Sequence, residues 1–363
     1  MIHVREHKIH NEGFYETRYL PKRVVLPLGQ HIGARPEPLV AKGDTVTIGQ
    51  CIARSQARVS ASLHASVSGT VADIKKYNHP TLGFDTAIVI DSRGDEEFPR
   101  KERNAQAMTR EELLAVIRDS GIVGMGGAGF PTHAKLESPK PIDTLIVNGC
   151  ECEPYLSCDN RLMVEHTECI LKGVEIACRI LEAERVIIAI EANKPEAIKR
   201  FNSKLHTRNS SVSNISIQTL PSAYPQGAEK QLIYNTTGRV VPAGGLPLEV
   251  GCVVQNVATL FAMCEAVYYG KPLIERMVTF AGSALEESKN VTLRIGTLVS
   301  ELFEKEVLKL KTDPRKIIFG GPMMGVAVTS LDYPILKGTS GVLFFTEDEC
   351  DLRSETNCIR CGR

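Results

Sequence analysis

The stretch GMGGAGFPTHAKL, from Gly124 to Leu136, places four glycines within six residues and then turns through Pro131 and Thr132 into an expected helix. Backbone without Cβ atoms allows N–H groups to converge on an anion and allows a phosphate or a flat ring to approach closely. A helix that begins here would add its positive dipole end. The loop follows an expected helix rather than a strand, so it does not fit the G-x-G-x-x-G pattern of a strand–turn–helix dinucleotide site. The stretch therefore predicts either a ligand-binding loop or a closely packed turn.

A second polar stretch, LIVNGCECEPYLSCDNR at residues 145–161, favours the ligand-binding alternative. The run DTLIVN predicts a buried strand, and Asn148, Glu151 and Glu153 follow at its carboxyl end. Ligands of α/β sheets bind at the carboxyl ends of strands, where an amide and two carboxylates can hold ribose hydroxyls, an amide or a ring edge. The two stretches together predict one binding site.

Alternating strands and helices extend on both sides of these motifs. TREELLAVIRDSG predicts a helix with a capping box of Thr109 and Glu112, ended by Gly121. Further helices are expected at 163–182, 194–205 and 227–238, further strands at 185–191 and 214–220, and a buried loop and helix at 250–270. This order predicts a mainly parallel sheet covered on both faces.

Modules rich in β-structure are expected on either side of this core. After an irregular arm at residues 1–25, short β-runs at 24–90 resemble the barrel-sandwich fold of biotinyl and lipoyl domains. Those carriers attach their cofactor to a lysine at a hairpin tip, and the matching turn at Ser60–His64 has no lysine. We therefore expect the barrel-sandwich fold here, but no attached cofactor. Residues 276–304 fit a β-grasp module that KIIFGGPMMG, at 316–325, could close.

Composition narrows the class of protein. The 363 residues are 43% apolar and carry 43 Lys plus Arg against 43 Asp plus Glu, a formal net charge of zero, which gives no footprint for nucleic acid. Met1 is not followed by a secretory signal, and no apolar stretch of about 18 residues predicts a membrane span. The eleven cysteines favour reduced thiols or cofactor ligands over a disulfide framework.

The cysteines fall into distinct groups. Cys358 and Cys361 match the first two ligands of a C-x2-C-x2-C cluster run, whose third ligand would fall at position 364, and two thiolates cannot hold a [4Fe–4S] cluster. Cys150, Cys152 and Cys158 are expected to line the site or pack rather than bind metal. Core positions are expected for Cys51, Cys169, Cys178, Cys252 and Cys264, while Cys350 has no assignment. His133 is expected to face solvent.

The paired motifs resemble the flavin and NADH site of the NADH-binding flavoprotein subunit of respiratory complex I. Along the whole chain, the order of modules is similar to that of the C subunit of the Rnf complexes, ion-translocating oxidoreductases that link NADH to ferredoxin. The resemblance implies a multidomain α/β protein with a barrel-sandwich domain at 1–100, an FMN- and NADH-binding domain at 101–272, and a β-grasp soluble-ligand-binding module at 273–335. Residues 336–363 would form a linker and the truncated start of a ferredoxin-like domain.

The same resemblance implies hydride transfer from NADH to FMN, with electrons passing to iron–sulfur clusters of the full-length protein and on towards ferredoxin. The implied partners are the membrane and ferredoxin-like subunits of such a complex, and the implied location is peripheral, on the cytoplasmic side of the bacterial inner membrane. It assigns cofactor-binding roles to Gly124, Gly126, Gly127, Gly129, Phe130, Lys135, Asn148, Glu151, Glu153, Tyr224, Gly227, Glu229, Val254, Gln255, Asn256 and Thr259.

Within that set, the resemblance implies that Lys135 binds the flavin phosphate, that Phe130 stacks on the nicotinamide or adenine, and that Glu153 and Glu229 face the nucleotide. Met125, Cys150 and Ala228 stand where complex I subunits have Arg, Asp and Glu, so weaker FMN or NADH binding is expected. Two alternatives remain open: a cobalamin reductase of bacterial microcompartments with the same domain order, and a non-catalytic scaffold.

Overall fold

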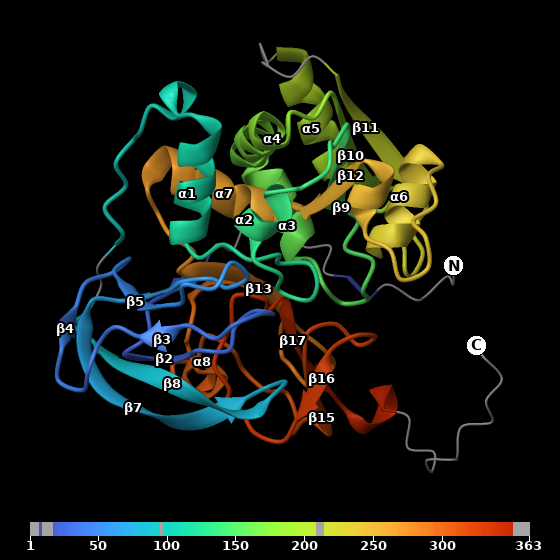
Figure 1. Cartoon of the computed structure of the whole chain (residues 1–363). Helices are drawn as coiled ribbons and strands as arrows, with labels where there is room; N and C mark the ends of the chain where they lie inside the picture. The colour runs from blue at the N-terminus through green and yellow to red at the C-terminus, as the bar shows by residue number, and fades with distance from the viewer. Residues whose placement is uncertain (1–6, 9–16, 95–96, 208–213, 351–363) are drawn as a thin grey trace.

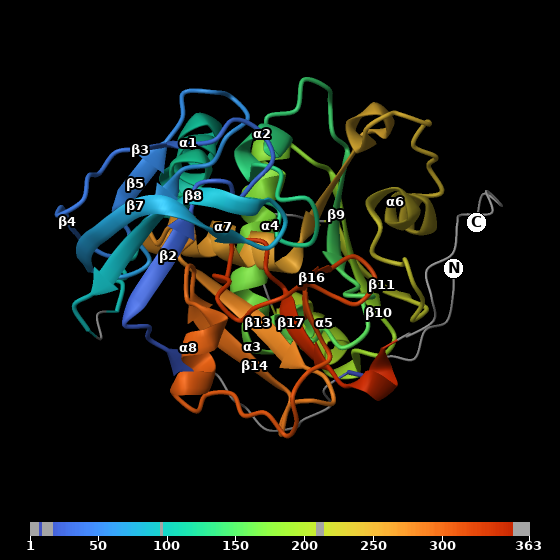
Figure 2. The same ribbon diagram turned by 90° about the horizontal axis from the view of Figure 1, so that it is seen from below.

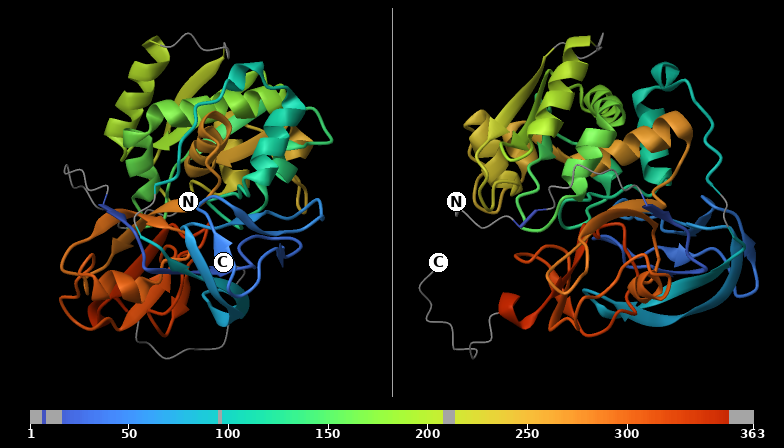
Figure 3. Two further views of the ribbon diagram at one scale, coloured as in Figure 1. Left: turned by 90° about the vertical axis from the view of Figure 1, so that its left-hand side faces the viewer. Right: turned by 180° about the vertical axis from the view of Figure 1, so that it is seen from behind.

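A computed structural model gives the fold, and it describes residues 7–8, 17–94, 97–207 and 214–350. Three modules are packed together: an α/β core, a β-rich head below it and a C-terminal sheet beside the head (Figure 1). Seen from below and from the sides, the head and the C-terminal sheet lie next to each other under the core (Figures 2 and 3). Among the described helices, none combines the length and apolar character that a membrane span requires.

The core is built on a parallel four-stranded sheet in the order β11-β10-β9-β12, with bounds Ile215–Leu220, Arg185–Glu191, Thr144–Gly149 and Cys252–Asn256. From β9 the chain moves outward to β10 and β11, and then returns to add β12 on the other side of β9. The direction of winding therefore changes between β9 and β12, and such a switch point forms a crevice at the carboxyl ends of the strands.

Helices cover both faces of this sheet, as expected from the sequence. The helices are α1 (Arg110–Asp119), α2 (Thr132–Leu136), α3 (Cys158–Glu165), α4 (Thr167–Leu181), α5 (Pro195–Thr207), α6 (Glu229–Thr237) and α7 (Val257–Tyr269). Leu145, Val147 and Val253 pack in the cluster that contains α4, α5 and α7, whereas Ile146 and Val254 pack with α6 on the other face. The period of two along each strand produces this division.

Local signals predicted some of these elements well and others poorly. The capping box of Thr109 and Glu112 is present at the start of α1. The helix expected at 163–182 is instead two helices, because His166 leaves the helical region with φ −119° and ψ 28°. Residues 252–256, expected as loop, form β12 because they pair with β9.

The head contains two small sheets. One has the order β2-β8-β7-β4 and the bounds Arg23–Pro27, Gly83–Ser92, Gly69–His79 and Thr45–Val46. The other has the order β3-β5-β6 and the bounds Glu37–Pro38, Cys51–Arg54 and Leu63–His64. The irregular arm expected at residues 1–25 is corrected in part, because β1 (Thr17–Tyr19) and β2 are strands paired with distant partners.

The C-terminal sheet has six strands in the order β1-β14-β13-β17-β15-β16. Apart from β1, its elements are β13 (Glu275–Ala281), β14 (Lys289–Arg294), α8 (Val299–Glu304), β15 (Lys316–Phe319), β16 (Val326–Val328) and β17 (Gly341–Phe345). Short 3-10 turns lie at Ala105–Ala107, Pro247–Val250 and Glu347–Glu349. Since β17 is a central strand, the sheet continues beyond the boundary expected at residue 335.

Lys337 ties the three modules together. Its fully buried Nζ donates to the carbonyl oxygens of Ser62 in the head and Gly121 in the core, each at 2.7 Å. Its backbone N–H donates to Gln30 Oε1 at 3.0 Å. The Ser60–His64 turn is buried by these contacts, so it cannot act as the exposed tip of a swinging carrier.

Candidate functional site

The Gly-rich loop joins α1 to α2 at the lower edge of the core (Figure 1). Its base is a short antiparallel pairing in which Gly124 N–H donates to Phe130 O at 2.9 Å. The tip, residues 126–128, is exposed. The head contacts the far end of the loop, where Ile32 N–H donates to Gly129 O at 3.3 Å. The loop therefore lies where the core meets the other modules.

Two glycines at the tip have different surroundings. A Cβ on Gly126 would come within 2.7 Å of Asn256 Nδ2, so this position requires glycine for packing. A Cβ on Gly127 would meet nothing within 4 Å. The space above Gly127 is therefore open, and the bare backbone there is available to a ligand.

Asn148 and Asn256 are register partners at the carboxyl ends of β9 and β12, at the switch point of the sheet. Asn148 Nδ2 donates to Gly227 O at 2.9 Å and so fixes the loop before α6. Asn256 Oδ1 caps α7 by accepting from Ala258 N–H at 2.8 Å, and its Nδ2 donates to Asp159 Oδ2 at 2.6 Å. Both amides are held in place by the protein itself.

Asp159 belongs to this site although the sequence motifs assigned it no role. It is buried, and its pKa is raised chiefly by burial and then by the negative charge of Glu151. Glu151 accepts hydrogen bonds from the N–H groups of Asp159 and Asn160, at 2.7 and 3.2 Å, and so caps α3. Lys8 covers this turn and donates to the Glu151 carbonyl at 2.6 Å. Glu151 thus stabilises the site rather than facing open space.

Glu153 reaches the C-terminal sheet. Its Oε2 accepts from Met323 N–H at 2.9 Å, and it packs against Gly321, where no Cβ could be accommodated. Burial raises the pKa of Glu153, while hydrogen bonds from the Met323 and Met324 N–H groups act in the opposite direction. This carboxylate joins the core to the turn between β15 and β16.

Lys135 and Glu229, expected to bind separate ligand groups, contact each other. Lys135 Nζ in α2 lies 2.6 Å from Glu229 Oε1 at the start of α6, and the side chains are 29% and 40% exposed. Glu229, which was expected to face the nucleotide, is therefore part of an ion pair at the surface. The attraction between their opposite charges explains the pairing.

The remaining residues that were predicted to bind a cofactor differ in how exposed they are. Phe130 is 37% exposed and can stack on a ring, whereas the Val254 side chain is buried against α6. Thr259 Oγ1 accepts from Met125 N–H at 3.0 Å, so this hydroxyl supports the loop. Tyr224 lies in the loop before α6, where it precedes Pro225.

Two buried glutamines near the strand ends have unused hydrogen-bonding capacity. Neither polar atom of Gln226, nor Nε2 of Gln255, has a hydrogen-bond partner within the part of the chain that the structure describes. Gln226 is 0% exposed and Gln255 is 2% exposed. Buried amides are normally satisfied, so these atoms indicate a partner such as water or a polar ligand.

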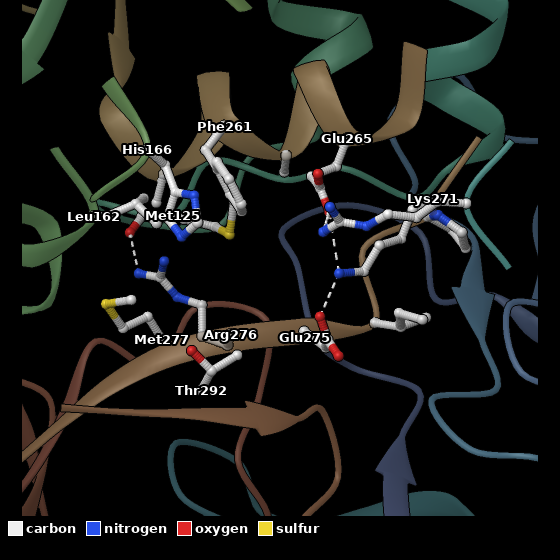
Figure 4. A pocket seen from close by; sticks show the side chains of 15 residues that line it. Met125, Leu162, His166, Phe261, Glu265, Lys271, Glu275, Arg276, Met277 and Thr292 are labelled. Atoms are coloured by element: carbon white, nitrogen blue, oxygen red, sulfur yellow. Dashed lines mark hydrogen bonds and ion pairs between the residues drawn. The ribbon is translucent and has the colours of Figure 1, made fainter. Parts of the chain in front are cut away.

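A cavity of about 60 Å³ lies on the inner side of the loop, between α7, the α3–α4 junction and the β13–β14 pair (Figure 4). It is lined by apolar groups such as Met125 and Phe261, and by Arg276 and a charged row in which Lys271 lies between Glu265 and Glu275. This volume holds a few water molecules and excludes a nucleotide. A nucleotide would have to approach from the exposed tip of the loop.

Two sequence-based expectations near the site are corrected. His133 is 6% exposed rather than solvent-facing; its Nε2 donates to Arg58 O at 2.9 Å, and burial lowers its pKa. Cys169 and Cys264 form a disulfide, with Cα atoms 5.7 Å apart, because α4 packs directly on α7.

The other cysteines are mostly enclosed. Cys150, Cys158, Cys178 and Cys252 are buried, while Cys51, Cys152 and Cys350 are partly exposed. Cys152 Sγ accepts from Gly227 N–H at 3.4 Å. Ligand atoms of Glu151, Cys158 and Asp159 lie within 4.8 Å of one another, but the carboxylates already accept hydrogen bonds from the protein. Cys358 and Cys361 lie outside the described residues.

Two family matches agree with this architecture. Residues 2–95 match the RnfC barrel sandwich hybrid domain, and residues 117–265 match the Nuo51 FMN-binding domain. The fold also resembles a chain of an NAD+-reducing [NiFe]-hydrogenase, with a TM-score of 0.57 and 22% identity, over 67% of this chain and 48% of that one.

Curated relatives extend over nearly the whole chain. The C subunit of the proton-translocating ferredoxin:NAD(+) oxidoreductase complex of Clostridium ljungdahlii is 47% identical, covering 96% of this chain and 76% of the relative. The Na(+)-translocating counterpart from Acetobacterium woodii is 37% identical, covering 94% of this chain and 77% of the relative. The C subunit of the ion-translocating oxidoreductase complex of Rhodobacter capsulatus is 40% identical, covering 100% of this chain and 70% of the relative.

Proposed function

Because the chain belongs to the RnfC family, the C subunits of the ion-translocating ferredoxin:NAD+ oxidoreductases, we propose that it is their FMN- and NAD(H)-binding electron-transfer subunit. One observation carries the proposal most directly. The exposed glycine tip, with open space above Gly127, lies beside the Asn148–Asn256 pair at the switch point of the parallel sheet. Phosphates and flat rings bind at such places.

The residues present fit a flavin mononucleotide. Gly126 and Gly127 would allow the ring or phosphate to approach the backbone, and the Lys135 ammonium would pair with the phosphate. The unused amide atoms of Gln226 and Gln255 supply donors and an acceptor for polar edges. When bound, FMN would exchange a hydride with NAD(H) and single electrons with iron–sulfur clusters. The protein contributes binding, orientation and electrostatics.

We also propose how NAD(H) is held. The exposed ring of Phe130 offers a stacking surface next to the loop. Glu229 could accept from ribose hydroxyls once a flavin phosphate binds Lys135 in its place. Glu153 would accept hydrogen bonds from NAD(H) on the side of the C-terminal sheet, where Met323 N–H already fixes the position of its carboxylate.

The wider assignments are proposals of the same kind. Strands β14-β13-β17-β15-β16, with β13 parallel to β17 and α8 after β14, support a β-grasp module. We propose that clusters ligated in part by Cys358 and Cys361 pass electrons towards ferredoxin. The partners would be the other subunits of the complex, with this subunit peripheral on the cytoplasmic side of the membrane.

Binding of FMN can be tested with a matched pair of glycine variants. Gly127→Val should abolish FMN retention without unfolding the protein, because no atom lies within 4 Å of the added Cβ. Gly338→Val is the control, since its Cβ also meets nothing within 4 Å and it lies outside the site. Wild type and control should take up FMN, measured by fluorescence quenching, and bleach on anaerobic addition of NADH. Equal FMN affinity in both variants would remove the loop from the site.

A further inference from the structure

The side chain of Arg276, in the C-terminal sheet, contacts the Gly-rich loop of the core. It lies on β13 of the C-terminal sheet and is 4% exposed. Its Nη2 donates to Met125 O at 3.1 Å, across 151 residues of sequence, and its Nε donates to Thr339 O at 3.2 Å. Figure 4 shows Arg276 and Met125 at the same end of the cavity behind the loop. A buried arginine is therefore directed at the backbone of the candidate cofactor site.

The Met125 residue is held from both directions. Its carbonyl accepts from Arg276, and its N–H donates to Thr259 Oγ1 of α7 at 3.0 Å. The Met125 carbonyl and the next N–H, that of Gly126, belong to one planar trans peptide and point in opposite directions. When Arg276 holds this carbonyl inward, the Gly126 N–H must point outward, towards the exposed tip.

The charge of Arg276 is compensated inside the same network. Its positive charge acts to lower the pKa of Asp159, against the stronger effect of burial. Asp159 in turn accepts from Asn256, whose amide packs against Gly126. A buried guanidinium needs carbonyl or carboxylate partners, and one of the two carbonyl acceptors of Arg276, that of Met125, belongs to the Gly-rich loop.

We propose that Arg276 is a positioning residue for the cofactor site. It fixes the Met125–Gly126 peptide so that an N–H faces the ligand, and it couples the position of the C-terminal sheet to the Gly-rich loop. The assignment of FMN as that ligand rests on the proposed function. The orientation of the loop by Arg276 does not.

Arg294 on the neighbouring strand β14 provides a matched control. It is 3% exposed, and its Nη1 lies 2.7 Å from Glu275 of the same sheet. Arg276→Met and Arg294→Met both remove a buried guanidinium, but only the first removes a contact to the loop. Arg276→Lys keeps the positive charge but offers a single donor nitrogen in place of the two that reach Thr339 O and Met125 O, so it should restore part of the effect.

The first measurement is hydrogen exchange of the FMN-free protein. In Arg276→Met, the Gly124 and Met125 amides should exchange at least about tenfold faster than in wild type, with Arg276→Lys intermediate and Arg294→Met unchanged. If Arg276→Met does not fold, Arg276→Gln, which is too short to reach the Met125 carbonyl, should give the same local pattern. Wild-type protection at both amides in a folded Arg276→Met or Arg276→Gln protein would overturn the proposal.

The second measurement is FMN affinity by fluorescence quenching. The dissociation constant should rise about tenfold in Arg276→Met, less in Arg276→Lys, and less than about twofold in Arg294→Met. Loss of amide protection with no FMN binding by wild type would support Arg276 and reject the proposed cofactor. Tight FMN binding by every variant, with amide protection unchanged, would reject the role of Arg276 and keep the cofactor.

Discussion

Lys135 Nζ lies 2.6 Å from Glu229 Oε1, and the two residues are 94 positions apart in the chain. Lys135 was expected to bind the flavin phosphate and Glu229 the nucleotide of NADH, yet the two side chains form an ion pair with each other. Because the side chains are 29% and 40% exposed, the pair contributes no more than about 1 kcal/mol. A phosphate could therefore displace Glu229 from the ammonium at little energetic cost.

Replacing the two partners should have unequal effects on FMN binding. Lys135→Met should weaken it by about tenfold to a hundredfold, since a charge-assisted hydrogen bond contributes about 1.5–3 kcal/mol. Glu229→Gln should leave the FMN dissociation constant within about twofold of wild type or lower it, because the ammonium is released. Fluorescence titrations at low and high salt would measure both, and the Lys135 effect should shrink with salt. Lys230→Met, on α6 next to Glu229, is the control. Equal losses of FMN affinity in the Lys135 and Glu229 variants would contradict this account.

Gly126 and Gly127 should respond differently to alanine. The added Cβ of Gly126→Ala would lie 2.7 Å from an Asn256 amide that is fixed by Asp159 and by the cap of α7, so overpacking should destabilise the protein by about 1–3 kcal/mol. Gly127→Ala meets no atom within 4 Å and should unfold with the free energy of wild type. Urea unfolding compares them directly. A larger loss for Gly127→Ala would show that the tip packs differently.

Elements encoded by neighbouring residues could be predicted from the sequence. The helix α1 carries its capping box in Thr109 and Glu112, and β9 contains the apolar run 145–147. The site motifs were also recognisable, since Asn148 at the end of β9 follows directly from the strand pattern. Local signals identified these features because the responsible residues are only a few positions apart.

Contacts between distant segments could not be predicted in this way. The partners of Arg276 and Lys337 lie in other modules, and no local period encodes a hydrogen bond to a carbonyl of another domain. The burial of His133 likewise depends on Arg58 in the head. The sequence therefore predicted candidate residues for a site, whereas the tertiary packing determines which of them contact one another.

Lys337 should make stability depend on pH. Burial lowers its pKa from 10.5 to about 7, and its two acceptors, Ser62 O and Gly121 O, match the two N–H groups of a neutral amine. Between about pH 7 and 10.5 the unfolded chain then binds more protons than the folded chain. The stability contributed by this group therefore rises with pH across that window and is lost as pH falls towards 7.

The difference in unfolding free energy between wild type and Lys337→Met should accordingly increase from pH 7 to pH 9. The slope cannot exceed about 1.4 kcal/mol per pH unit, the limit for one proton. Lys42→Met, which removes a lysine side chain that is 70% exposed, is the control measured over the same pH range. A Lys337 difference that is flat or falls with pH would mean that a charged ammonium is buried in the folded protein.

The cysteines lead to a prediction about iron. Thiolates, not thiols, bind iron, and burial raises the pKa of both Cys150 and Cys158. The carboxylates of Asp159 and Glu151 raise the pKa of Cys158 further. These cysteines should therefore remain protonated and should resist alkylation at pH 7 in the folded protein.

After anaerobic reconstitution, the 363-residue chain should contain far less than stoichiometric iron and sulfide, because Cys358 and Cys361 supply only two of the four thiolates that a cubane cluster needs. A Cys358→Ser, Cys361→Ser double variant should remove any residual iron, whereas Cys158→Ser should leave it unchanged. Iron and acid-labile sulfide analysis of the three proteins provides the test. Stoichiometric iron that survives the double variant and is lost with Cys158→Ser would assign the cluster to Cys150, Cys152 and Cys158. In that case the buried thiols beside the sheet would be ligands, and our interpretation of them as packing residues would be wrong.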